Sequence, residues 1–342
     1  MNARLEAYGT KRTPLPANPL PQWGHEIRKA YTLCTTQEQA AIQRDSDQDT
    51  VLIRLLGYLL RFCPPEGLAS LTTEINSSKG NTERLIALGM YWKDAFLGVS
   101  PSSHPTRDSV IVTTDAVREL LTPGPLDYRR SKELALRHHR NCCALSRKHG
   151  ITADEQEWNP VENPGRAQLN CAMSGPNGLD KGKLTWAATC LAVLAPFLGD
   201  NAADDVLHHF NGDNVHDLRN VFIATRDLHG MFDGMYICLE ARAEANMYTL
   251  KQVVGGTLDH QLIDKILDMN SPYPNIPAVS PEFLALHRAC AIVAHLSGAG
   301  ELLEKEERDR EPDNRHELPA GGGKQSREWD LFQYRLTSIS VQ

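Results

Sequence analysis

The stretch that most constrains the fold is residues 220–239, which read NVFIATRDLHGMFDGMYICL. It opens with an apolar, strand-like run, and Thr225 then stands at the position of a helix N-cap. The apolar residues that follow have helical spacing, whereas His229 and Asp233, four residues apart, share another face of that short helix. The pattern predicts a strand, a short helix and a second strand, with one imidazole and one carboxylate side by side.

The order of Asn220, TRDLH at residues 225–229 and FDG at residues 232–234 resembles the second half of an HNH motif. In particular it is similar to the HNH nuclease-domain proteins of filamentous fungi. The resemblance implies an α+β fold, with a small ββα-metal core embedded in a mainly α-helical protein. It also implies catalytic positions at His229 and Asn220, and a weak metal site on His229 and Asp233 that need not be occupied. The metal would be Mg²⁺, Mn²⁺ or Zn²⁺ if the protein is a nuclease.

The first half of the motif departs from the family pattern. In the family, a strand reading A-H-I-x-P-F carries the general base, and residues 183–199, KLTWAATCLAVLAPFLG, take its place. Alignment on the shared Pro-Phe pair puts Val193 on the histidine. Valine has no lone pair, so it cannot accept a proton from the attacking water. The preceding residues are apolar too, so the site lacks its base and a carboxylate ligand.

The entry to the motif, R-x-G-x-R-C-x-x-T-G in the family, has two counterparts in this chain. Cys143 in RHHRNCCALS, followed by Ser146, is one, and Cys171 in NCAMSG at residues 170–175 is the other. Both match about equally well, so the choice between Cys143 and Cys171 stays open.

The histidines and cysteines of RHHRNCCALS also invite a metal hypothesis. Adjacent pairs such as His138 and His139 point in different directions on a helix or a strand, which makes them poor chelates. The same segment, residues 129–140, is rich in arginine and lysine. It is the best local candidate for phosphate contact, although a solvated helix face explains it as well.

The chain divides into five segments on composition and punctuation. We predict an extended, proline-rich arm (1–25), a helical region (26–125), the HNH-like ββα region (126–255), C-terminal helices (256–303) and a charged, glycine-rich disordered tail (304–342). Predicted helices include residues 37–44, 49–63, 67–76, 81–97, 131–145, 258–269 and 280–298, and predicted strands include 235–239 and 249–254.

Composition limits the class of protein. The 342 residues carry a net charge of −7, which disfavours a broadly basic nucleic-acid-binding surface. The eight cysteines lack paired C-x-x-C spacing, which disfavours a disulfide framework. No apolar run is long enough to span a membrane, and the N-terminus lacks a secretory signal pattern. These features predict a cytoplasmic or nuclear protein that is not secreted and has no membrane contact.

Three functions follow, and the residues leave them open. The chain is a non-catalytic scaffold that binds a protein partner, or a repurposed enzyme acting on a small organic molecule, as in fungal secondary-metabolite biosynthesis. The alternative is an active metal-dependent HNH endonuclease that hydrolyses phosphodiesters. Whether the chain is an enzyme, and whether it contacts nucleic acid, therefore depends on the site around His229.

Overall fold

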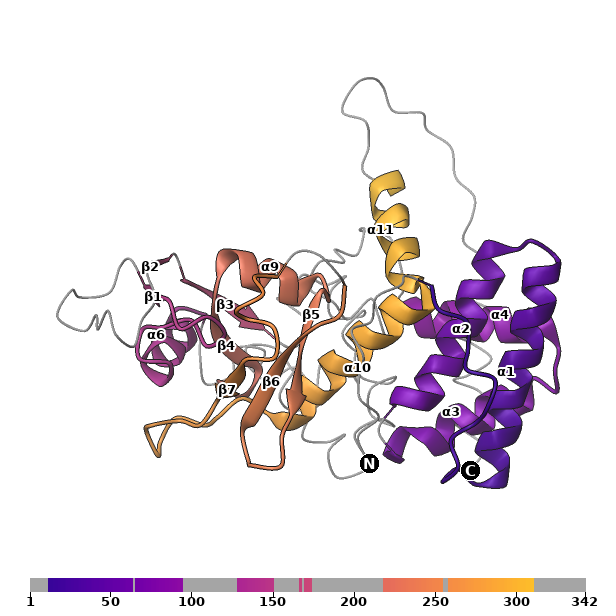
Figure 1. Cartoon of the computed structure of the whole chain (residues 1–342), viewed down its shortest axis with the longest axis horizontal. Coiled ribbons are helices and arrows are strands. Elements are labelled where there is room, and N and C mark those ends of the chain that lie inside the picture. Colours follow the sequence, from indigo (N-terminus) through magenta and orange to yellow (C-terminus); the bar gives the residue numbers. More distant parts are fainter. Residues whose placement is uncertain are drawn as a thin grey trace, which may run out of the picture.

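The computed structural model describes residues 12–63, 65–94, 128–150, 166–167, 169–173, 218–254 and 258–310. These residues form a mixed α+β structure that is mainly helical and contains a small three-stranded antiparallel sheet (Figure 1). The predicted α+β class is confirmed. A helical region and a β-rich region lie on either side of one long helix, α10 (Figure 1).

The helical region contains α1 (His25–Gln43), α2 (Asp47–Phe62), α3 (Pro65–Ser77) and α4 (Thr82–Trp92). The prediction that the first helix begins at residue 37 was wrong, because α1 begins at His25. Its buried residues, including Tyr31, Cys34 and Glu38, recur at intervals of three or four. The buried face therefore continues upstream through a segment whose composition is mostly polar.

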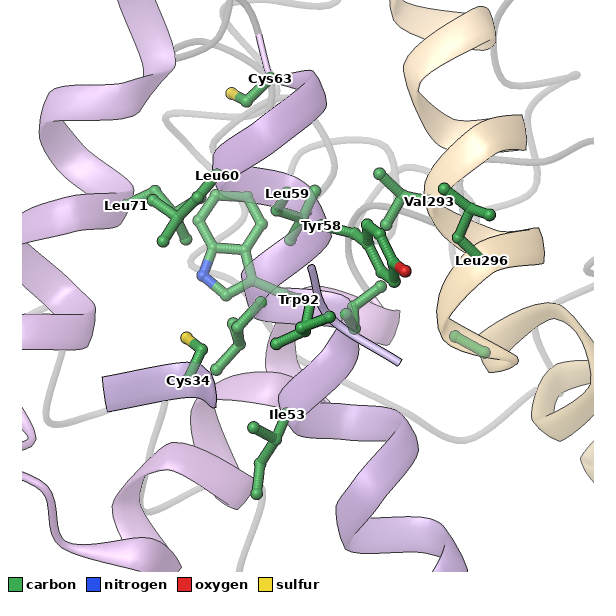
Figure 2. Close-up of a cluster of buried hydrophobic side chains, with 14 of the residues drawn as sticks. Cys34, Ile53, Tyr58, Leu59, Leu60, Cys63, Leu71, Trp92, Val293 and Leu296 are labelled. Carbon is green, nitrogen blue, oxygen red and sulfur yellow. The ribbon is translucent and has the colours of Figure 1, made fainter. Parts of the chain in front are cut away.

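The helical core is the cluster of buried side chains centred on α2. Every residue from Thr50 to Leu60 is buried, so α2 is surrounded on all sides. Figure 2 shows Leu59 and Tyr58 of α2 near Val293 and Leu296 of α10. The segment before α1, residues 12–24, has no helix or strand, as predicted for the arm, but it packs against this core through Leu15 and Trp23.

The β-rich region begins with α6 (Tyr128–His138) and a short parallel pair, β1 (His149–Gly150) and β2 (Arg166–Ala167). Strand β3 (Leu169–Met173) then pairs antiparallel with β4 (Val221–Thr225), which follows the short 3₁₀ helix η4 (Leu218–Asn220). Helix α9 (Arg226–Asp233) comes directly after β4.

The three-stranded sheet consists of β5 (Ile237–Ala241), β6 (Met247–Gln252) and β7 (Ile266–Asp268), in that order. The expected helix over residues 258–269 was wrong. Asp264 has a positive φ of 61°, which a helix does not accommodate, and Leu267 pairs with Tyr248 of β6. The apolar residues whose spacing suggested a helix lie in turns and in the edge strand β7.

Helix α10 (Pro281–Ser297) was predicted from its punctuation, and the prediction is confirmed. Ser280 caps its N-terminus, Pro281 occupies its first turn, and Gly298 ends it with a φ of 84°. The expectation of disorder from residue 304 was wrong for the start of that segment, because α11 (Ala299–Arg310) follows α10. Its Glu, Lys and Arg residues are good helix formers. The rest of the expected tail, 311–342, lies outside the described residues.

Candidate functional site

The candidate site is the β3–β4–α9 unit, a β–β–α arrangement of the kind expected around His229. Its register pairs Cys171 with Ile223 and Leu169 with Thr225, and α9 lies against both strands. The strand expected in residues 183–199, with Val193 at the base position, lies outside the described residues. Within the described residues β4 pairs with β3.

A turn that contains Cys143 closes one end of this unit. The Cys143 sulfur accepts hydrogen bonds from the backbone amides of Ser146, at 3.3 Å, and Thr225, at 3.4 Å. The amide of Ala144 donates to the carbonyl of Ile223 at 2.8 Å. Cys143 therefore fixes this turn to the junction between β4 and α9, whereas Cys171 lies within β3. Sequence alone did not distinguish these two positions.

Helix α9 carries the two predicted ligands as a pair. His229 Nδ1 lies 3.2 Å from Asp233 Oδ2, one helical turn away, with 26% and 16% of the two side chains exposed. Burial raises the pKa of Asp233, and the neighbouring His229 opposes this shift. The predicted shared face is thus present, and the two side chains bond to each other across it.

Asn220 is the other predicted site residue, and it is fully buried at the start of β4. The residue before it, Arg219, accepts a 2.7 Å hydrogen bond at its carbonyl from the amide of Ser280, the N-cap of α10. Asn220 thus lies where the β3–β4–α9 unit meets α10.

His287 of α10 contacts the same unit, and the sequence pattern around it gave no sign of this contact. Its ring stacks on Phe232 of α9, with centroids 3.6 Å apart and planes inclined by 6°. Its Nε2 lies 2.8 Å from the Phe232 carbonyl, which accepts a hydrogen bond if Nε2 carries the proton. Burial lowers the pKa of His287 to about 4, so the ring is neutral at pH 7. His287 anchors α9 to α10.

Within the basic segment 129–140, the two histidines and the described arginines differ in exposure. His138 and His139 are buried, with ring centroids 4.5 Å apart, whereas Arg137 and Arg140 are exposed. Burial lowers the pKa of His139 to about 3. His138 Nε2 lies 3.3 Å from the carbonyl of Met269. Both rings therefore lie in the interior at the end of α6, whereas Arg137 and Arg140 face solvent.

The donors around α9 do not amount to a divalent metal site within the described part of the chain. No three His, Cys, Asp or Glu side chains there are placed to hold one ion. His229 and Asp233 are two donors, fewer than the three or four protein ligands of a zinc site. The described residues therefore do not by themselves form a zinc site.

Comparison with known proteins finds no matching family model, curated protein or solved structure. Among the described helices, none combines the length and apolar character needed to cross a membrane.

Proposed function

We propose that this chain is an HNH-like protein whose β3–β4–α9 unit serves as a binding scaffold and not as a metal-dependent nuclease. The observation that carries the proposal is that His229 and Asp233 pair with each other, while no third His, Cys, Asp or Glu among the described residues is placed to share an ion with them. Two protein donors fall short of the three or four that a zinc site uses.

The attachment of α9 to the rest of the fold supports the same proposal. Phe232 is fully buried, in an edge-to-face contact with Phe222 of β4 and stacked on His287 of α10. At the other end of the helix, the Thr225 amide bonds to Cys143. A unit fixed at both ends presents a rigid surface, which a binding module needs and which requires no metal.

A second candidate, a repurposed enzyme, is favoured by the orientation of His229. A carboxylate beside Nδ1 favours the tautomer with the proton on Nδ1 and the lone pair on Nε2, which is the form that a general base uses in acid–base catalysis. About a quarter of the His229 side chain is exposed, so a small organic molecule can reach it. In this candidate function, the His229–Asp233 pair acts as the general acid–base group.

Duplex DNA cleavage with Mg²⁺ or Mn²⁺ tests the scaffold proposal. We expect no cleavage above the level of the matched variant His229→Ala. General bases contribute roughly a hundredfold to ten-thousandfold in rate, and Val193 aligns with the base position. Val193→His should regain at most weak, metal-dependent nicking, which His229→Ala should then abolish. Robust cleavage by the unmodified chain that disappears in His229→Ala would instead establish the nuclease alternative.

The scaffold and the repurposed enzyme differ in what Asp233→Asn does. For a scaffold, Asp233→Asn keeps a polar partner for His229 and should leave ligand binding unchanged. For an acid–base enzyme, it should lower turnover of any small-molecule substrate at least tenfold while leaving substrate affinity within a factor of two or so. The measurement is a screen of small molecules for binding and turnover, run in parallel on the unmodified chain and on Asp233→Asn.

A further inference from the structure

Residues 13–23 lie along α1 and α2 without helix or strand, and they contain Pro-Leu-Pro twice, at 14–16 and 19–21. The segment bends at residues 17–18 and turns at residues 21–22, where the Trp23 amide donates to the Leu20 carbonyl at 3.1 Å. Proline favours extended backbone in itself and in the residue before it, so such a segment loses little conformational freedom when it docks. The helices contact it in a regular way, at its carbonyls, at one amide and at one leucine side chain.

Side chains of α1 and α2 bond to the carbonyl oxygens along the segment, and Arg28 Nη2 donates to the Pro21 carbonyl at 2.6 Å. The Tyr58 hydroxyl lies 3.0 Å from the Thr13 carbonyl and 2.9 Å from the Pro14 carbonyl. The Tyr31 hydroxyl donates to the Pro16 carbonyl at 2.7 Å, and Arg61 Nη1 donates to the Asn18 carbonyl at 3.2 Å. These bonds recognise backbone and not side chains, so any extended peptide can supply the acceptors.

The Thr13 amide donates to the Leu296 carbonyl of α10 at 3.0 Å, and α1 binds the amide of Leu15, which lies between two prolines. The Leu15 amide donates to both carboxylate oxygens of Glu38, at 3.1 and 3.2 Å. Glu38 is only 1% exposed and is held by Arg54. A buried carboxylate in this position requires a residue with an N–H at the centre of the motif, which excludes proline there.

The leucine side chain fits into a space made by Gly57 in the middle of α2. A Cβ at Gly57 would lie 2.5 and 2.6 Å from the two Leu15 methyl groups. Glycine stabilises a helix interior less than alanine does. Its presence in α2 is explained by the Leu15 side chain, which occupies the space that a larger residue would need. Further along the segment, the Trp23 ring contacts Tyr31 edge-to-face, with centroids 5.2 Å apart, and Arg61 lies over it.

We propose that this groove on α1 and α2 is a recognition site for extended Pro-Leu-Pro peptides, which residues 13–23 occupy as an intramolecular ligand. The partner it fits is a protein that carries a Pro-Leu-Pro segment, which takes the place of the chain's own. The contacts that specify it are the Glu38 carboxylate, the tyrosine hydroxyls and the Gly57 space, and all of them lie on the groove. Because a tethered segment has a high effective concentration, the unmodified chain binds such a peptide weakly.

A labelled synthetic peptide of residues 12–23 tests this proposal on the full chain. Leu15→Ala weakens the chain's own segment and leaves the groove intact, so it should bind the peptide at least about tenfold more tightly than the unmodified chain. Adding Gly57→Ala, which fills the leucine space and favours the helix, should remove that gain. A peptide with aspartate in place of its first leucine is the control and should not bind.

Three results overturn the proposal. They are no peptide uptake by a folded Leu15→Ala chain, uptake that Gly57→Ala does not reduce, and equal uptake of the aspartate control. Circular dichroism establishes folding. If Leu15→Ala does not fold, Arg12→Gln replaces it, because Arg12 is one-third exposed and secures the same segment through Asp47 and Glu301. Failure of Arg12→Gln to take up the peptide would show that residues 13–23 are a fixed part of the helical core.

Discussion

The two halves of the molecule bury ionisable groups in opposite ways. In the helical core, Glu38 and Arg54 are buried together as an ion pair that also holds the Leu15 amide. In the β-rich region, His139 is buried and the partly buried His287 stacks on Phe232, and desolvation lowers their pKa to about 3 and about 4. The helical half thus stabilises buried charges as an ion pair, whereas the β-rich half holds its imidazoles in the neutral form. The two halves should therefore lose stability under different conditions.

Acid should produce the largest difference between them. A histidine whose pKa is lower in the folded chain than in the unfolded chain binds its proton more tightly in the unfolded chain. The free energy of unfolding therefore falls as the pH drops from about 6.5 towards 4. One pKa unit corresponds to ~1.4 kcal/mol, so the two imidazoles together cost on the order of several kcal/mol by pH 4. Native-state hydrogen exchange should show protection lost first around α9 and α6.

The matched variants for this titration are His287→Gln and His25→Gln. Glutamine can still donate to the Phe232 carbonyl, so His287→Gln should flatten the loss of stability between pH 6.5 and 4. His25 has 87% of its side chain exposed, so its replacement should leave the titration curve unchanged. Equal curves for all three chains would remove His287 as the source of acid sensitivity.

Glu38→Ala should have the next largest effect, and it should act on the helical half. It leaves the Arg54 charge buried without its counter-ion and the Leu15 amide without its acceptor. Breaking such a buried pair costs about 3–5 kcal/mol of unfolding free energy. Urea denaturation at pH 7 measures the loss.

Glu244→Ala is the control for that experiment, because it removes an exposed partner at 3.7 Å from Arg242 in the β-rich half. Exposed pairs contribute about 0–1 kcal/mol. If the two variants lose the same stability, burial of the Glu38–Arg54 pair is not what distinguishes the halves.

Capping residues, prolines and glycines at the ends of helices made several helices predictable from sequence. Helix α10 was found between Ser280 and Gly298 because capping residues and proline act within a few residues of one another. Strand β7 was missed because the spacing of Leu262, Ile263 and Leu267 also suits a helix, and only pairing with β6 decides it. Non-local pairing carries no local signal, which is also why the partner of β4 was not identified.

In the candidate site, too, local contacts could be predicted from sequence and tertiary contacts could not. The His229–Asp233 contact was foreseeable, because residues four apart on a helix are neighbours. The stacking of His287 on Phe232 was not, since it joins two helices that are distant in sequence. Burial of His139 was also missed, because a histidine beside arginines reads as solvent-exposed. Sequence indicated the residues within α9, and the tertiary fold supplied what holds them.

The smallest expected effect concerns two helix caps, one serving each side of the comparison. Asn81 accepts the Arg84 amide at 2.9 Å at the start of α4, and Ser280 accepts the Phe283 amide at 3.3 Å at the start of α10. Replacing either by alanine should cost about 1 kcal/mol of unfolding free energy. Denaturation alone should therefore not separate the two variants.

Hydrogen exchange should separate them, because the helices have different neighbours. Helix α4 packs within the helical half, so Asn81→Ala should lower protection only there. Helix α10 gives Leu284 to the β-rich core and Val293 to the helical core, so Ser280→Ala should lower protection in both halves. Loss confined to one half would mean that α10 does not transmit stability between the cores. Parallel loss in both halves would mean that a helix shared by two differently built cores makes them unfold as one.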